Sequence, residues 1–136
     1  MFCGCKLLKS INFENFDASD VISLNYMFSC CTSLTNVNLS NFNTNKVKYM
    51  SGMFEGCSSL KSLDLSNFDT SNVEWMDEMF LGCSSLTSID LSSFNCDKID
   101  PDGRMKDMFK YCTKLKFENV KQSDNKIIDQ LLINLK

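Results

Sequence analysis

The chain of 136 residues carries 14 basic and 17 acidic side chains and no histidine, so its formal net charge at pH 7 is −3. This balance argues against nucleic acid as a partner, and the lack of histidine removes the commonest general base and metal ligand. The length suits a single domain, and no apolar run approaches the roughly 18 residues that a membrane span requires. We therefore expect that no segment of this chain inserts into a membrane.

The N-terminal residues already belong to a repeat. Residues Met1–Cys5 read MFCGC and align with Met27–Cys31, which read MFSCC. No apolar signal core precedes them, and Gly4-Cys5 is only a weak likeness of a lipoprotein cleavage site. Because solenoids normally seal their first coil with a polar cap, we expect the first coil to be either exposed or part of a longer array.

A repeat of 26 residues organises the chain, with cysteines at Cys31, Cys57 and Cys83. The shared pattern is C-x-x-L-x-x-L-x-L-S-x-F-[DN]-x-x-x-V-x-x-M-x-x-M-F-x-G. A fixed period in this range predicts a solenoid, in which each coil buries its apolar face only against its neighbours. The apolar columns are Leu8, Leu34, Leu60, Leu86 and Leu115; Ile11, Val37, Leu63 and Ile89; Phe13, Leu39, Leu65, Leu91 and then Val120; Phe16, Phe42, Phe68 and Phe94; Val21, Val47, Val73 and Ile99; and Leu24, Met50, Met76 and Met105.

Two segments of each repeat predict secondary structure. The alternation at the end of L-x-x-L-x-L indicates a short strand, with Leu63 and Leu65 pointing inward and Asp64 outward. Equivalent strands of successive coils would form a parallel sheet. The segment V-x-x-M-x-x-M-F has an apolar residue at every third position. This spacing predicts a short α or 3-10 turn on the opposite side, with Asp69–Ser71 where its N-cap belongs.

The end of the chain departs from the period. Cys112 follows Cys83 by 29 residues, and the three additional residues fall in the turn-forming run Asp100–Arg104. Ser123-Asp124 then precede an apolar-periodic segment that predicts a helix. We expect an α/β solenoid of about five coils over residues 1–122, the first one partial, and a capping helix over residues 123–136. The helix would close the core with Ile127, Ile128, Leu131, Leu132 and Leu135.

The copy from Cys57 to Gly82, CSSLKSLDLSNFDTSNVEWMDEMFLG, closely resembles the leucine-rich repeats of BspA-like bacterial surface proteins, which are also frequent in mycoplasmas. The resemblance extends over residues 1 to about 120 of this chain. It implies a right-handed, leucine-rich-repeat-like coil with short parallel strands on one face. It also implies an exported or lipid-anchored protein of the cell surface that takes part in adhesion to host or bacterial proteins.

Most of the eight cysteines share one position of the repeat. We expect them to form a buried stack of small apolar thiols, because their spacing does not suit zinc. Disulfides between adjacent coils would be strained, since side chains in register point the same way. Cys3, Cys30 and Cys96 lie off this column and are expected to be exposed. The column itself is Cys5, Cys31, Cys57, Cys83 and Cys112.

Two polar columns accompany the apolar ones. The first alternates carboxylate and amide and predicts side chains that hold a turn by accepting backbone N–H groups. Its members are Asp17, Asn43, Asp69 and Asn95. The second lies on the outward side of the strands, which is the usual binding surface of a horseshoe repeat. This predicted binding face comprises Asn12, Asn36, Asn38, Ser62, Asp64, Ser66, Ser88, Asp90 and Ser92, with Ser40 beside them.

The chemistry of these side chains favours binding over catalysis. Asp64 and Asp90 lack a nucleophile or third group that would make them an acid–base couple, and calcium would need six to eight oxygen ligands. The outward column Ser23, Tyr49 and Trp75 offers either aromatic contacts for a partner or a cover over the seam between coils.

These patterns predict a non-catalytic module without cofactor or metal that binds protein, with glycan as the second ligand class. The alternative is a structural spacer in a longer repeat protein, with no ligand of its own.

Overall fold

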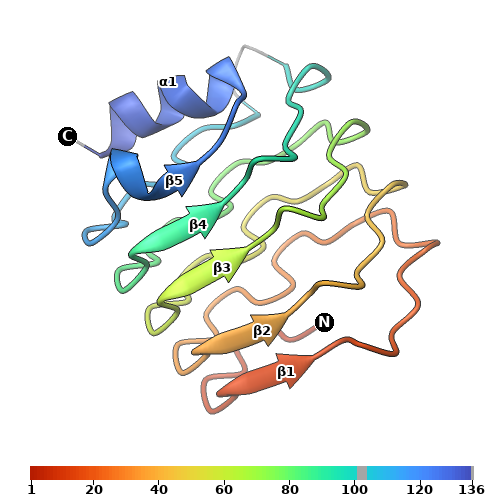
Figure 1. The fold of residues 1–136 in the computed structure, drawn as a ribbon. Coiled ribbons are helices and arrows are strands. Elements are labelled where there is room, and N and C mark those ends of the chain that lie inside the picture. The colour runs from red at the N-terminus through yellow and green to blue at the C-terminus, as the bar shows by residue number, and fades with distance from the viewer. Residues whose placement is uncertain (101–103, 136) are drawn as a thin grey trace.

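The structure, a computed structural model, describes residues 1–100 and 104–135. Within these residues the chain forms a small α/β arrangement of short parallel strands and one helix (Figure 1). The elements are β1 (Ser10–Asn12), β2 (Asn36–Asn38), β3 (Ser62–Asp64), β4 (Ser88–Asp90), the 3-10 turn η1 (Phe117–Asn119), β5 (Val120–Lys121) and α1 (Asn125–Asn134). The strands belong to two sheets, β1–β2 and β3–β4–β5. Most of the insertion predicted at Asp100–Arg104 lies outside the described residues.

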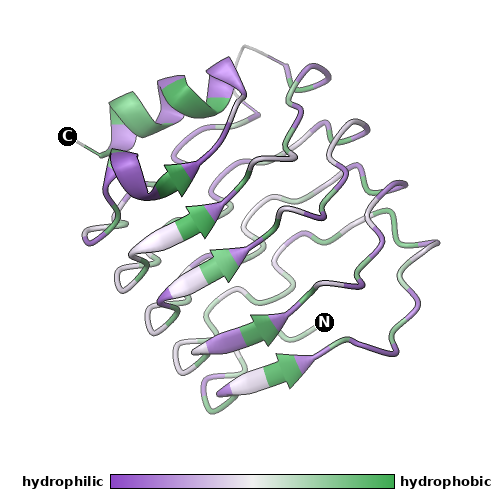
Figure 2. Cartoon of the chain, viewed as in Figure 1, coloured by the Kyte–Doolittle hydropathy of each residue, from purple (hydrophilic) through white to green (hydrophobic). Residues whose placement is uncertain are grey.

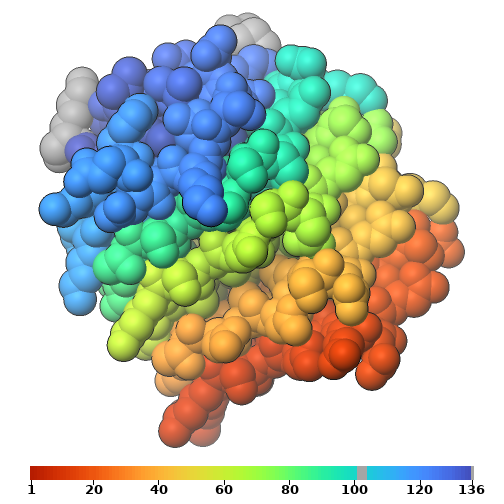
Figure 3. Space-filling model, in the orientation of Figure 1, coloured from red at the N-terminus to blue at the C-terminus, as the bar shows by residue number. Residues whose placement is uncertain are grey.

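The repeat period sets the register of both sheets. Ile11 pairs with Val37, and Leu63 pairs with Ile89, so one repeat is one step across the sheet. Each of β1 to β4 carries one apolar residue between two polar ones (Figure 2). This apolar residue packs in or against the core. On the surface, successive repeats therefore form parallel bands from β1 towards α1 (Figure 3).

The last strand is displaced from its predicted position. Val120 pairs with Ile89, whereas the repeat pattern aligned it with Leu91. The 3-10 turn η1 occupies the residues immediately before it, so β5 begins two residues later than the pattern predicts. Val120 is buried all the same, because both columns face the core.

Stacked phenylalanine rings run through the core. The rings of Phe28, Phe54, Phe80 and Phe109 follow one another with centroid distances of 5.4, 5.9 and 5.5 Å, and all four side chains are fully buried. Burial of one large apolar side chain contributes about 1.5–3 kcal/mol. A single repeat has no neighbour against which to bury its phenylalanine ring. Stacked repeats bury one another's rings and so gain this stabilisation.

The side opposite the strands is built from turns, and the prediction of α or 3-10 turns there is wrong for the described residues. The N–H of Phe28 donates to the carbonyl of Met53 at 2.9 Å, and the N–H of Phe54 donates to Met79 at 2.9 Å. A helical turn would use these donors internally. Here the backbone N–H groups bond to the next repeat instead, which requires some residues in the left-handed conformation. Gly52 and Gly82 are two of these residues, with φ of 60° and 73°.

The helix α1 covers the last repeat. Asp124 caps it by accepting the N–H of Lys126 at 2.8 Å, and the other carboxylate oxygen of Asp124 accepts the N–H of Cys96 at 2.8 Å. Ile127 and Leu131 are buried under the helix. Leu132 was predicted on the same face but is 55% exposed, because it follows Leu131 by about 100° around the helix axis.

Candidate functional site

The polar residues predicted as a binding face do lie on one surface. Parallel pairing places Ser10 beside Asn36 and Ser62 beside Ser88, and the row two residues later in the same way, on the outer side of the strands. Eight of the nine predicted residues are exposed, and Asp90 is partly covered. The strand face, as we call this surface, consists of Asn12, Asn36, Asn38, Ser62, Asp64, Ser66, Ser88, Asp90 and Ser92.

The carboxylates of the strand face are partly engaged by the protein itself. Asp64 Oδ1 accepts the N–H of Ser66 at 2.9 Å and its hydroxyl at 2.6 Å. Asp90 Oδ1 makes the same two bonds to Ser92 at 3.0 and 2.6 Å. These bonds hold the turn that follows each strand. The turn therefore engages Oδ1 of each aspartate and leaves Oδ2 out of these bonds.

Lys121 gives the two aspartates different electrostatic surroundings. Its ammonium lies 3.1 Å from Asp90 Oδ2, so both oxygens of Asp90 have partners. The hydrogen bond from Ser92 and the nearby Lys121 lower the pKa of Asp90 below its ordinary value. Asp64 Oδ2 has no hydrogen-bond or ion-pair partner among the described residues. The sequence analysis missed Lys121, because β5 is displaced from the repeat pattern.

Two shallow hollows meet at Asp64. One, of 250 Å³, lies between β3, β4 and β5 and is lined by Ser62, Asp64, Ser88, Asp90 and Lys121 together with Leu63, Ile89 and Asn119. The other, of 180 Å³, lies between β2 and β3 and is lined by Asn38, Ser40, Asp64, Ser66 and Asn67 together with Val37 and Leu39. Asp64 lines both hollows, which together form a polar trough. Hydroxyls, amides and one carboxylate oxygen make this trough a hydrogen-bonding surface.

The second polar column holds the corner after the strands. The side chains of Asp17, Asn43, Asp69 and Asn95 each accept the backbone N–H two residues further on, at 2.8–3.1 Å. These residues form Asx turns, and they do not face the trough.

Thr44 and Thr70 form a buried column at this corner that the sequence analysis overlooked. The Thr70 hydroxyl donates to the carbonyl of Asn95 at 3.0 Å and accepts the N–H of Asn95 at 2.8 Å. Thr44 makes the same pair of bonds to Asp69. The available signal was the recurrence of threonine after 26 residues, at Thr44 and Thr70. Each hydroxyl joins one repeat to the next.

The cysteine column is buried in four of its five members. The thiols of Cys57 and Cys83 donate to the carbonyls of Phe28 and Phe54 at 3.2 and 3.1 Å. Burial raises the pKa of Cys57 and of Cys112 to about 12, and that of Cys83 well above its ordinary value. Cys5 is exposed, contrary to the prediction, because no described residue covers it from the preceding side.

Cys96 also differs from its predicted environment. It was expected to be exposed, but it is fully buried, and burial together with Asp124 raises its pKa to about 12. It occupies the same column as Ala18, Thr44 and Thr70, which are all buried. Cys3 and Cys30 are exposed. All eight cysteines are free thiols.

Tyr49 and Trp75 lie side by side, with ring centroids 4.9 Å apart. The guanidinium of Arg104 lies 4.4 Å from the centroid of the Trp75 ring. Trp75 is only 38% exposed, and its partners come from the repeats on either side. This arrangement favours the interpretation that Trp75 covers the junction between repeats, since the Trp75 ring already lies against Tyr49 and Arg104.

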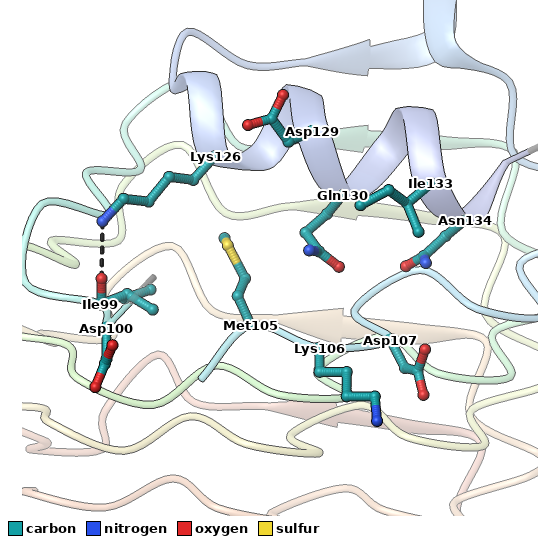
Figure 4. Close-up of a pocket in the computed structure, with 10 residues that line it drawn as sticks. All are labelled: Ile99, Asp100, Met105, Lys106, Asp107, Lys126, Asp129, Gln130, Ile133 and Asn134. Atoms are coloured by element: carbon teal, nitrogen blue, oxygen red, sulfur yellow. Dashed lines mark hydrogen bonds between the residues drawn. The ribbon is translucent and has the colours of Figure 1, made fainter. Parts of the chain in front are cut away.

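A further hollow, of 470 Å³, lies between α1 and the last repeat (Figure 4). Its charged residues include Asp100, Asp107, Lys126 and Asp129. The ammonium of Lys126 donates to the carbonyls of Cys96 and Ile99 at 2.8 Å each, so it anchors the helix. Nowhere in residues 1–100 and 104–135 do three or more acidic, cysteine or histidine side chains come together as they would around a metal ion. Within the same residues, α1 is too short and too polar to cross a membrane.

The sequence pattern of one family matches residues 1–126, and its description is "Mycoplasma protein of unknown function, DUF285". The chain belongs to this family. Comparisons with curated proteins and with solved structures find no match. Membership of the DUF285 family agrees with the repeats of this chain, and the description of the family assigns it no activity.

Proposed function

We propose that this protein is a non-catalytic binding module whose strand face recognises a partner protein. The observation that carries the proposal is the polar trough of two hollows that Asp64 lines, together with the unpaired Oδ2 of Asp64. Within each of the two sheets, strand pairing holds the surrounding amides and hydroxyls in register. Side chains that are already ordered within a sheet lose less conformational entropy on binding than those of a flexible segment.

We infer that the partner presents hydrogen-bond donors to this trough. A lysine or arginine side chain, or a backbone amide, would suit the unpaired carboxylate oxygen of Asp64. Sugar hydroxyls would suit the same surface, so glycan is the second ligand class. The net charge of −3 disfavours nucleic acid. We expect no cofactor and no metal, and without histidine the chain lacks the usual general base of an enzyme.

The finer classification also belongs to the proposal. We infer a right-handed, leucine-rich-repeat-like solenoid over residues 1–122 with a capping helix over residues 123–136. The support is the register of one repeat per strand and the resemblance to BspA-like surface proteins. That resemblance points to adhesion at a bacterial cell surface, and membership of a mycoplasma family agrees with it.

The test uses the purified chain on a panel of immobilised host and bacterial surface proteins and on a glycan array. Asp64→Asn removes the charge but keeps the turn, because Asn38 accepts the Ser40 N–H in the same way at 3.1 Å. Asp64→Lys reverses the charge, and Asp97→Lys is the matched control at an exposed position outside the trough. Binding that both Asp64 variants weaken and the control retains would support the strand face.

Two outcomes would overturn the proposal. Binding that survives both Asp64 variants would place the contact elsewhere on the molecule. If the chain binds none of the probes while a longer protein containing it does, the chain is a structural spacer between other parts of that protein.

A further inference from the structure

The sheet is interrupted between β2 and β3, in the middle of the strand face. The N–H of Leu65 donates to the carbonyl of Asp90 at 3.0 Å, and the N–H of Leu91 donates to Lys121 at 2.7 Å. At the equivalent place, the N–H of Leu39 makes no bond to Asp64. No ladder pairs the two strands, and among the described residues these are the only consecutive strands left unpaired.

A threonine fastens the boundaries on either side of this one. The N–H and the hydroxyl of Thr35 both donate to the carbonyl of Lys9, at 2.8 and 3.0 Å. Thr87 makes the same two bonds to the carbonyl of Lys61. Lys61 occupies this column at the interrupted boundary and has no hydroxyl on Cβ. Its N–H makes no bond to the carbonyl of Thr35.

Two pairs of phenylalanine rings are also further apart across this boundary than across the boundary before it. The Phe42 and Phe68 rings, which face each other across it, have centroids 6.4 Å apart, against 5.7 Å for Phe16 and Phe42 at the boundary before. In the other stack, the pair across the boundary is Phe54 and Phe80 at 5.9 Å, the largest spacing in that stack. In both rows the rings are thus further apart here than at the boundary between β1 and β2.

The turn side remains closed. The N–H groups of Met50, Gly52 and Phe54 donate across the same boundary to Trp75, Asp77 and Met79, at 2.8–2.9 Å. On the strand side, the amide of Asn67 spans the gap and donates to the carbonyls of Leu39 and Ser40 at 3.0 Å each. Backbone hydrogen bonds thus hold the boundary on the turn side, whereas the Asn67 side chain spans it on the strand side.

We propose that the boundary between β2 and β3 is a seam at which the strand side opens while the turn side acts as the hinge. The seam divides the protein into two blocks, one with β1 and β2 and the other with β3, β4, β5 and α1. Lys61 sets its position by replacing the threonine that fastens the neighbouring boundaries. The 180 Å³ hollow beside Asn38 and Asp64 is the mouth of the seam.

The seam bears on recognition, because it separates Asn38 from Asp64 on the strand face. A partner that contacts both residues would hold the two blocks together. This consequence rests on the proposed function, whereas the seam itself is a property of the free chain.

Amide hydrogen exchange of the free, full chain, followed residue by residue by NMR, tests the seam. Leu39, Leu65 and Leu91 occupy equivalent buried positions. We expect the Leu39 amide to exchange at least about tenfold faster than those of Leu65 and Leu91, because only its ladder bond is missing. Equal exchange rates for the three amides would overturn the proposal.

Two substitutions test the cause. Lys61→Thr supplies the missing hydroxyl and should slow Leu39 to the rate of Leu65. Thr87→Lys places the same lysine at the next boundary and should speed exchange at Leu65 while leaving Leu91 unchanged. Both positions are exposed, and spectra with native dispersion would show that the variants fold. A folded Lys61→Thr variant with unchanged Leu39 exchange would overturn the role of Lys61.

The link to recognition has its own readout. Any probe that binds in the arrays should slow Leu39 exchange in the wild-type chain. If no probe binds, the exchange pattern of the free chain still decides the seam. If a probe binds without affecting Leu39, it does not bridge the two blocks, and that consequence of the seam is lost.

Discussion

The strand side and the turn side of this protein join the same repeats in different ways. On the strand side, three-residue strands pair in two sheets and leave a gap between β2 and β3. On the turn side, parallel bridges run without a break from Ser23 to Tyr49 and from Tyr49 to Trp75. The continuous connection lies on the side without regular secondary structure, so strands alone do not hold these repeats together.

The difference follows from what each side buries. The turn side carries Met27, Met53 and Met79 and the Phe28–Phe109 stack, nearly all of them completely covered. The strand side offers one apolar residue per strand and exposes the polar residues beside it. We expect the turn side to determine stability and the strand side to determine recognition. Four predictions, from the largest expected effect to the smallest, would break or sharpen this contrast.

The largest effect should come from the phenylalanine stack. Phe54→Ala removes a fully buried ring that stacks on Phe28 and Phe80, at 5.4 and 5.9 Å. We expect the free energy of unfolding in urea to fall by about 3–5 kcal/mol. Phe16→Ala is the comparison, because that ring is 38% exposed and should cost clearly less. Equal losses would mean that the stack is no more important than the edge of the core.

Alkaline pH should destabilise the protein through its buried thiols. Cys57, Cys96 and Cys112 have pKa values of about 12, so the folded state keeps protons that the unfolded chain loses near pH 9. Stability is therefore full below about pH 9 and falls as the pH rises towards 12, by about 1.4 kcal/mol per pH unit for each thiol. Urea midpoints between pH 7 and 10 measure this.

Thiol accessibility provides the control for the alkaline effect. At pH 8, an alkylating reagent should label Cys3, Cys5 and Cys30 rapidly and leave the other five until the protein unfolds. Rapid labelling of Cys96 in the folded protein would contradict its place under Asp124.

The hydroxyl bonds at the corner should matter more than those on the strand face. Thr70→Val keeps the shape but leaves the N–H and carbonyl of Asn95 without their partner. We expect a loss of about 1–3 kcal/mol in the free energy of unfolding. The exposed Thr35→Val removes one hydroxyl bond to Lys9 and should cost about 0.5 kcal/mol. A larger loss at Thr35 would reverse the proposed ranking of the two sides.

The smallest effect concerns the left-handed glycines of the turn side. Gly56→Ala at φ 67° meets only ordinary contacts with Cys30, so it should cost about 1 kcal/mol from backbone strain alone. Gly52→Ala should cost more, because its Cβ would overlap the Tyr26 ring. The added variant Tyr26→Ala should remove that excess in a double-mutant cycle measured by urea unfolding. An excess that persists without the ring would point to another cause.

Much of this architecture is predictable from the repeat. The period places Leu63 beside Ile89, and the alternation around Asp64 correctly indicates which side of the strand is polar. The Asx turns follow from side chains that accept local N–H groups, as Asp69 does from Ser71 at 3.0 Å. These features depend on residues close in sequence or on exact repetition. The sequence of one repeat is therefore enough to predict these features.

The errors have a common origin in contacts beyond one repeat. Apolar residues at every third position suggested a helical turn, yet the N–H groups there bond to the next repeat, which spacing alone does not reveal. Cys96 is buried because Asp124 and α1 cover it. Val120 pairs with Ile89 because η1 takes up the residues before it. For the candidate site, the strand residues were foreseen but the Lys121–Asp90 pair was not.

The sequence by itself determined which residues are equivalent: the same letter recurs every 26 positions, and chemically identical side chains come to lie beside one another. The tertiary structure alone decided how tightly each repeat holds the next, and which of the two strand-face aspartates keeps an unpaired carboxylate oxygen. Equivalence is a property of one repeat, but a hydrogen bond or a buried surface needs the neighbour that supplies the other half. Leu39 and Leu65 therefore share one pattern, yet only Leu65 finds its bond across the sheet.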